Sequence, residues 1–287
     1  MRIAAAPISW GVCEVPGWGY QMSPDRVLKE MAAVGIEATE FGPDGFLPDD
    51  PAAKAATLAS YGLKAVGGFV PVVLHNPDHD PAPEVDRALD SFVAAGGDVL
   101  VLSANSGQDG YDSRPELTQN GWATMFANLD RLAALAASRG VKAALHPHVG
   151  TMVETAEDVR RVLAGSSIPL CLDTGHLLIG GTDPVALAQA HADRVVHVHA
   201  KDVDLALAKR VQDGELTYQE AVAQGLYTAL GQGDIDFKAI VAALDGAGFD
   251  GWYVMEQDTI LGAEPVGEGP LADVKASVAF LRALTSE

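Results

Sequence analysis

The sequence contains few cysteines and few basic residues, and both shortages restrict the class of protein. Two cysteines, Cys13 and Cys171, occur in 287 residues, so no disulfide framework is indicated and a reducing cytoplasm is the expected location. Lys and Arg number 19 against 39 Asp and Glu, which gives a formal net charge of −20. A field of this sign repels phosphate backbones and anionic lipids, which argues against nucleic acid or a membrane as partner.

Long apolar runs, linkers and dinucleotide-binding glycine motifs are also missing. No window approaches the roughly 18 uninterrupted apolar residues of a membrane helix, and the apolar run in residues 1–7 is too short for a signal peptide. No Ser-, Pro- or charge-rich linker divides the chain, and no GxGxxG follows the first expected strand. We therefore expect a single domain over residues 1–287.

The sequence does contain a repeated alternation of strand and helix signals. Short runs rich in β-branched residues are each followed by a turn and an Ala/Leu-rich stretch with helical spacing. The expected strands lie near residues 3–9, 36–41, 63–70, 98–103, 141–146, 168–173, 194–199 and 252–256. Eight such units predict an α/β fold, a closed (β/α)₈ TIM barrel. An extended loop over 203–234, after the seventh strand, is expected to act as a lid or as an oligomer contact.

Histidines gather where such a barrel builds its active site, at the carboxyl ends of the strands. Five of the eight fall at the ends of strands five, six and seven: His146, His148, His176, His197 and His199. Asp173 and Glu256 end runs that are otherwise apolar, and a buried carboxylate needs a cation or strong hydrogen-bond donors. Imidazoles and carboxylates from neighbouring strands predict a divalent-metal site that suits Zn²⁺, Mn²⁺, Co²⁺ or Fe²⁺.

Several segments resemble the xylose-isomerase-like sugar isomerase/epimerase superfamily. They are 145–151 (LHPHVGT), 173–176 (DTGH), 197–202 (HVHAKD), 231–237 (GQGDIDF) and 251–256 (GWYVME). Residues 6–11 (APISWG) and 39–42 (TEFG) are most similar to the inosose dehydratases within that superfamily. The resemblance implies a metal-dependent lyase that enolises a small neutral keto-polyol beside its ketone and eliminates a β-hydroxyl. Mn²⁺ or Co²⁺ is the preferred cofactor, and Zn²⁺, Fe²⁺ and Mg²⁺ are also compatible.

The resemblance also implies roles for particular residues. The metal would be held by His146, Asp173, His199 and Glu256, and Glu40 would act near the substrate. Sugar epimerases of the superfamily usually place a glutamate, both ligand and base, where this chain has His146. A neutral imidazole cannot be assumed to be the base, so the base is sought among His176, His148 and Glu256, with His176 preferred.

Further side chains are expected at the site from their positions on the strands. Trp10, at the end of the first strand, offers a flat apolar wall for a ring. Period-two alternation places His197 and Lys201 on the same face as His199, where His197 can contact substrate and Lys201 can protonate a leaving hydroxyl. The same alternation places His148 on the face of His146, so His148 is a candidate metal ligand as well.

Alternative activities remain open, because several reactions begin with the same enolisation. They are isomerisation or 3-epimerisation of a ketose or inosose, and β-elimination from a 3-keto-glycoside or anhydrosugar. A metal-binding protein without catalysis is a further alternative. The fold also serves metal-dependent DNA-repair endonucleases, but the deficit of Lys and Arg argues against a nucleic-acid groove.

Overall fold

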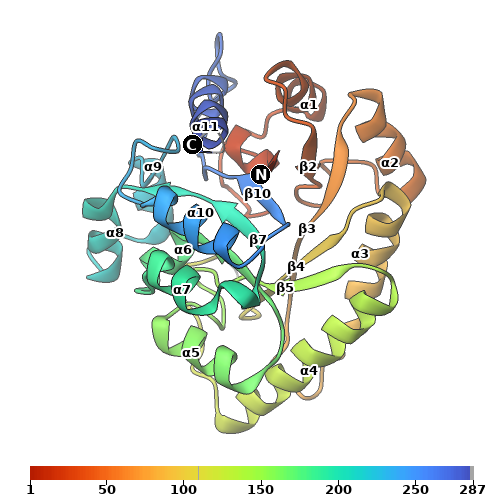
Figure 1. The fold of residues 1–287 in the computed structure, drawn as a ribbon, viewed down its shortest axis with the longest axis vertical. Helices are drawn as coiled ribbons and strands as arrows, with labels where there is room; N and C mark the ends of the chain where they lie inside the picture. The colour runs from red at the N-terminus through yellow and green to blue at the C-terminus, as the bar shows by residue number, and fades with distance from the viewer. Residues whose placement is uncertain (109, 285–287) are drawn as a thin grey trace.

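The computed structural model describes residues 1–108 and 110–284, and in these ranges eight parallel strands form a closed barrel surrounded by helices (Figure 1). In chain order the barrel strands are β1 (Arg2–Ala5), β2 (Ala38–Glu40), β3 (Lys64–Val72), β4 (Val99–Ala104), β5 (Lys142–Leu145), β6 (Leu170–Asp173), β7 (Val195–Ala200) and β10 (Trp252–Met255). Neighbours in the ring follow chain order, and β1 pairs with β10 to close it. The predicted (β/α)₈ barrel is confirmed. The single-domain boundaries 1–287 stay a prediction, and residues 109 and 285–287 lie outside the described ranges.

Helices cover the outside of the barrel between successive strands (Figure 1). They are α1 (Pro24–Ala33), α2 (Pro51–Ser60), α3 (Ala82–Ala95), α4 (Gln119–Ser138), α5 (Ala156–Gly165), α6 (Thr174–Ile179), α7 (Pro184–His191), α10 (Phe237–Gly246) and α11 (Leu271–Leu284). The side chains of Ser23, Asp50 and Asp183 accept hydrogen bonds from the first turns of α1, α2 and α7. Within the described ranges, no helix is both long enough and apolar enough to cross a membrane.

The first strand is shorter than expected. The predicted strand 3–9 ends at Ala5, and a 3₁₀ helix, η1 (Pro7–Trp10), follows because Pro7 lacks an N–H for the sheet and suits a first helical position. The turn carries Trp10 away from the barrel mouth into the core beside α1. There its indole Nε1 donates to Glu30 Oε2 at 2.8 Å.

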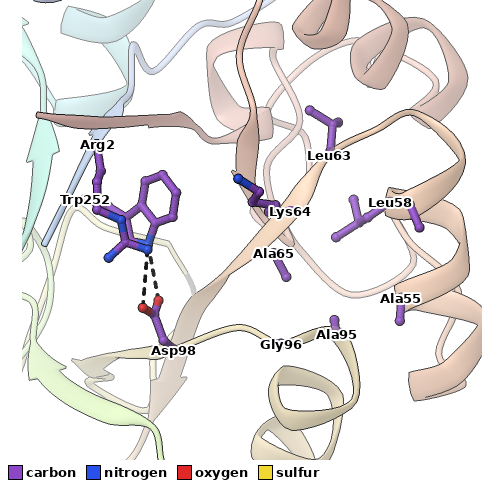
Figure 2. Close-up of a pocket in the computed structure, with 11 residues that line it drawn as sticks. Arg2, Ala55, Leu58, Leu63, Lys64, Ala65, Ala95, Gly96, Asp98 and Trp252 are labelled. Carbon is purple, nitrogen blue, oxygen red and sulfur yellow. Dashed lines mark hydrogen bonds and ion pairs between the residues drawn. The ribbon is translucent and has the colours of Figure 1, made fainter.

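A polar and aromatic cluster lies at the amino-terminal end of the barrel, beside a pocket (Figure 2). The Arg2 guanidinium stacks over the Trp252 ring, 3.9 Å from its centroid. Trp252 Nε1 donates a hydrogen bond to Asp98 Oδ1 at 3.2 Å, and Arg2 forms an ion pair with Asp98 at 3.6 Å. The adjacent cavity, about 280 Å³, is lined mainly by small and apolar side chains of α2, α3 and β3. This end of a TIM barrel serves stability, while the opposite end carries the active site.

The extended segment after β7 is folded. It contains β8 (Asp202–Val203), α8 (Leu205–Gln212), α9 (Tyr218–Ala223) and β9 (Tyr227–Thr228), with β8 and β9 antiparallel. The Asp202 carboxylate accepts backbone N–H bonds from Gly231, Gly233 and Ile235 at 2.8–3.0 Å. Asp202 therefore fixes the loop that returns the chain from the segment to the barrel.

Candidate metal centre and active site

The carboxyl ends of the strands open into a cavity of about 870 Å³. Its polar lining includes two histidines of the segment after β5, two side chains from β7 and its end, and three carboxylates: His146, His148, His199, Lys201, Glu40, Glu256 and Asp258. A cavity of this volume is ample for a small ring compound. The cavity lies where the fold predicts the active site.

The four residues expected as metal ligands converge at the base of this cavity. His146 Nε2 lies 2.9 Å from Asp173 Oδ2, and His199 Nδ1 lies 3.5 Å from the same oxygen and 3.3 Å from Glu256 Oε2. Neighbouring ligands of a tetrahedral ion with bonds of about 2.1 Å are spaced by about 3.4 Å. Asp173, His199 and Glu256 thus lie at the spacing of one coordination sphere, and His146 contacts Asp173 beside them.

The protonation of His199 supports a cation between the carboxylates. Its Nε2 donates to Glu40 Oε1 at 2.9 Å, whereas its Nδ1 is buried without a hydrogen-bond partner in the described part of the chain. Burial opposes a charge on His199, yet the acidic groups around it, Glu256 and Glu40 among them, raise its pKa well above the usual value. Burial also raises the pKa of Glu256 to about 7. The carboxylates of this cluster therefore outnumber the positive charges beside them, and the cluster fits a divalent cation.

Glu40 lines the cavity but is hydrogen-bonded to the imidazoles of His197 and His199. Its Oε1 accepts from both His197 Nε2, at 2.8 Å, and His199 Nε2. Burial opposes its ionisation, but the charge of His199 and the hydrogen bonds from both imidazoles hold its pKa below the usual range. Glu40 thus orients the His199 ring. His197 is fully buried beneath the cavity and, like Trp10, is absent from its lining.

His148 and His176 stack on one another, with ring centroids 3.6 Å apart. His148 lines the cavity, and its Nδ1–H donates to the Val149 carbonyl at 2.7 Å, which leaves a lone pair on Nε2. Burial holds the pKa of His148 well below the usual value, so the ring is neutral near pH 7. His176 lies behind His148, with its Nε2 3.2 Å from Lys201 Nζ, and burial also lowers its pKa. The cavity surface therefore presents His148 rather than His176.

Lys201 places an ammonium group at the edge of the carboxylate cluster. Its Nζ lies 2.5 Å from Asp258 Oδ1, 3.1 Å from Glu256 Oε2 and 3.8 Å from Asp173 Oδ2. Burial opposes the charge, but Asp258 and the other carboxylates raise the pKa of Lys201 well above its usual value. The side chain is thus a charged proton donor in contact with the cavity.

Three further residues of the site were missed from the sequence: Asp258, Tyr218 and Tyr227. Tyr218 Oη donates to Asp258 Oδ2 at 2.5 Å and lies 3.1 Å from the Tyr227 hydroxyl. The two-residue spacing that places Lys201 on the same face as His199 also places Asp258 on the same face as Glu256. The strand alternation could therefore have predicted Asp258. No periodic pattern connects the tyrosines of the 203–234 segment with the barrel.

The fold and this site define a (β/α)₈-barrel enzyme with a histidine and carboxylate centre. A family model described as "Xylose isomerase-like TIM barrel" matches residues 28–284, and the chain belongs to that family. Inosose dehydratases of Geobacillus thermodenitrificans and Geobacillus kaustophilus are 31% and 34% identical, over 90% of this chain and 90% and 87% of theirs. The structure of the IolI protein with a bound zinc atom is similar at a TM-score of 0.72 and 17% identity, over 100% of this chain and 98% of that one.

Proposed function

We propose that this chain is a metal-dependent dehydratase that removes water from a neutral keto-cyclitol such as scyllo-inosose. The observation that carries the proposal is the meeting, in one cavity, of the histidine and carboxylate cluster, a neutral imidazole with a free Nε2 and a buried ammonium. The similarity to proteins named inosose dehydratase, over about nine-tenths of the chain, supports the choice of reaction and substrate.

The chain's own residues supply the proton transfers. A divalent cation held by His146, Asp173, His199 and Glu256 would stabilise the negative charge that develops on the ketone oxygen during enolisation. His148 Nε2 accepts the proton from the carbon beside the ketone, and the C–H electron pair moves into the new double bond. The C–O bond to the β-hydroxyl then breaks with its electron pair, and Lys201 Nζ donates the proton that completes water.

Several finer points belong to the same proposal. The chemistry of the four ligands and the zinc named for the IolI structure support a divalent metal, for which we propose Mn²⁺ or Co²⁺. A role in inositol catabolism, a cytoplasmic location and a homo-oligomer in which the 203–234 segment takes part are proposed with it. Elemental analysis of the purified protein tests the metal, and sedimentation tests the oligomer.

The decisive experiment incubates the metal-loaded protein with scyllo-inosose in D₂O and follows the products by NMR and mass spectrometry. We expect loss of one water molecule, together with exchange of the hydrogen beside the ketone. Deuterium uptake without loss of water would instead identify an isomerase or epimerase that uses the same enolisation. An unchanged substrate, with neither exchange nor water loss, contradicts the proposal.

A further inference from the structure

Asp258 connects the reacting end of the cavity with the segment after β7. Its Oδ1 accepts a hydrogen bond from the Lys201 ammonium at 2.5 Å, and its Oδ2 accepts one from the Tyr218 hydroxyl at 2.5 Å. All three side chains are buried. Because a carboxylate is rigid and planar, a movement of Tyr218 displaces the same anion that holds Lys201.

Asp258 also decides where the Lys201 ammonium lies. The other anions within reach are Glu256 Oε2 at 3.1 Å and Asp173 Oδ2 at 3.8 Å, both members of the expected metal cluster. Without Asp258 these carboxylates are the remaining attraction, and they draw the ammonium toward the position of a cation. The Asp258 carboxylate counters that attraction and keeps the proton donor apart from the metal ligands.

The segment that carries Tyr218 packs on the barrel through a small apolar cluster. Its residues, among them Val203, Ala208 and Leu226, meet Trp18, Val149 and Ile179 there, and this cluster is separate from the main core of the barrel. The strands β8 and β9 that begin and end it have only two residues each. A segment that is held to the barrel by a small cluster and few backbone hydrogen bonds can open at a lower cost than the barrel itself.

We propose that Asp258 is a positioning residue that places Lys201 for proton donation when the 203–234 segment is seated through Tyr218. The role of Lys201 in this statement rests on the proposed function. The structural link from the 203–234 segment through Asp258 to Lys201 does not depend on the proposed function, and a separate experiment tests it.

Hydrogen–deuterium exchange of residues 217–228 tests the link without any substrate. Wild-type protein is compared with Tyr218→Phe, Asp258→Asn and Lys201→Met, and with Thr217→Ala as a positive control, because that variant removes the side-chain cap of α9 inside the measured window. Coupling between two sites is reciprocal, so we expect Lys201→Met, a change on the barrel, to raise exchange in the segment by about tenfold, as Asp258→Asn does. If exchange in Lys201→Met and in Asp258→Asn stays at the wild-type rate, the proposal is overturned.

Turnover of scyllo-inosose tests the consequence for catalysis. Loss of a hydrogen bond to a charged group should lower kcat of Tyr218→Phe by about 10- to 100-fold while KM changes little. Thr217→Ala removes the side-chain cap of α9 without contact to Asp258 and should keep wild-type kcat. The Tyr218→Phe/Asp258→Asn double variant should lose no more than Asp258→Asn alone.

The outcomes separate the two proposals. Additive losses in the double variant, or a Thr217→Ala loss equal to that of Tyr218→Phe, would show that the segment acts through general stability and would overturn the role of Asp258. If wild-type protein fails to turn over scyllo-inosose while Lys201→Met still raises exchange in 217–228, the proposed function fails and the Asp258 link is supported.

Discussion

At the scale of single residues, the hydrogen bond that each imidazole makes decides which nitrogen is available for chemistry. His199 donates from Nε2 to Glu40 and therefore presents Nδ1 to the carboxylates. His148 donates from Nδ1 to the Val149 carbonyl and presents Nε2 to the cavity. The free nitrogens of these two histidines thus suit the different roles proposed for them, His199 as a ligand and His148 as a base.

Replacement of His148 tests its proposed role as base. We expect His148→Ala to lower kcat by about 10²- to 10⁴-fold, because general base catalysis contributes factors of that size. Metal content, measured by elemental analysis, should stay at the wild-type level. His191→Ala, at the end of α7, is the control. Loss of metal together with activity would identify His148 as a ligand instead.

Replacement of Glu40 tests its role in orienting His199. Glu40→Gln keeps the size of the side chain but removes the charge that two imidazoles share, and we expect metal affinity to fall by about 10- to 100-fold. Competition with a chromophoric chelator measures the affinity. Glu37→Gln, an exposed carboxylate just before β2, is the matched control. Equal affinities of Glu40→Gln and wild-type protein would contradict this role.

At the scale of elements, the segment after β7 depends on the single side chain of Asp202. Asp202→Ala leaves the backbone N–H groups of Gly231, Gly233 and Ile235 without their acceptor, so we expect a loss of about 3 kcal/mol of unfolding free energy in urea. Asp204→Ala, which removes the cap of α8, should cost about 1 kcal/mol. Equal effects of the two variants would exclude the special role of Asp202.

The elements that were predictable from the sequence are those with local signals. Strand ends followed from β-branched runs, and helix starts followed from capping residues such as Ser23 and Asp183. The first strand was predicted too long because an apolar run hides the effect of Pro7. Trp10 was accordingly expected at the barrel mouth but packs beside α1. The contact of Tyr218 with the site had no local signal, because it depends on how the whole segment folds over the barrel.

At the scale of the whole molecule, the buried histidines predict acid sensitivity of the metal-free protein. Burial lowers the pKa of His146 from 6.5 to about 4 and also lowers that of His148, His176 and His197. The unfolded chain therefore binds more protons than the folded one in this range, and stability present above pH 6.5 is lost as pH falls toward 4. His199 and Glu256, whose pKa values are raised, act in the opposite direction but are outnumbered.

Urea unfolding of the metal-free protein at several pH values measures this effect. We expect the midpoint to fall steadily between pH 7 and pH 4.5. Added divalent metal should raise the midpoint near pH 7, because an ion that binds only the folded chain stabilises it by mass action. A midpoint that is constant over this pH range would show that the histidines are not buried as neutral rings.

The pairing of β1 with β10 has a consequence for how the molecule is made. Arg2 to Ala5 align with Trp252 to Met255, so β1, which is made before the other barrel strands, waits for β10. Until then the nascent sheet has two open edges, which are prone to wrong pairing. Glu256 and Asp258 follow β10 directly. Closure of the barrel and completion of the proposed metal site therefore occur together during synthesis. A nascent chain that still lacks β10 has neither.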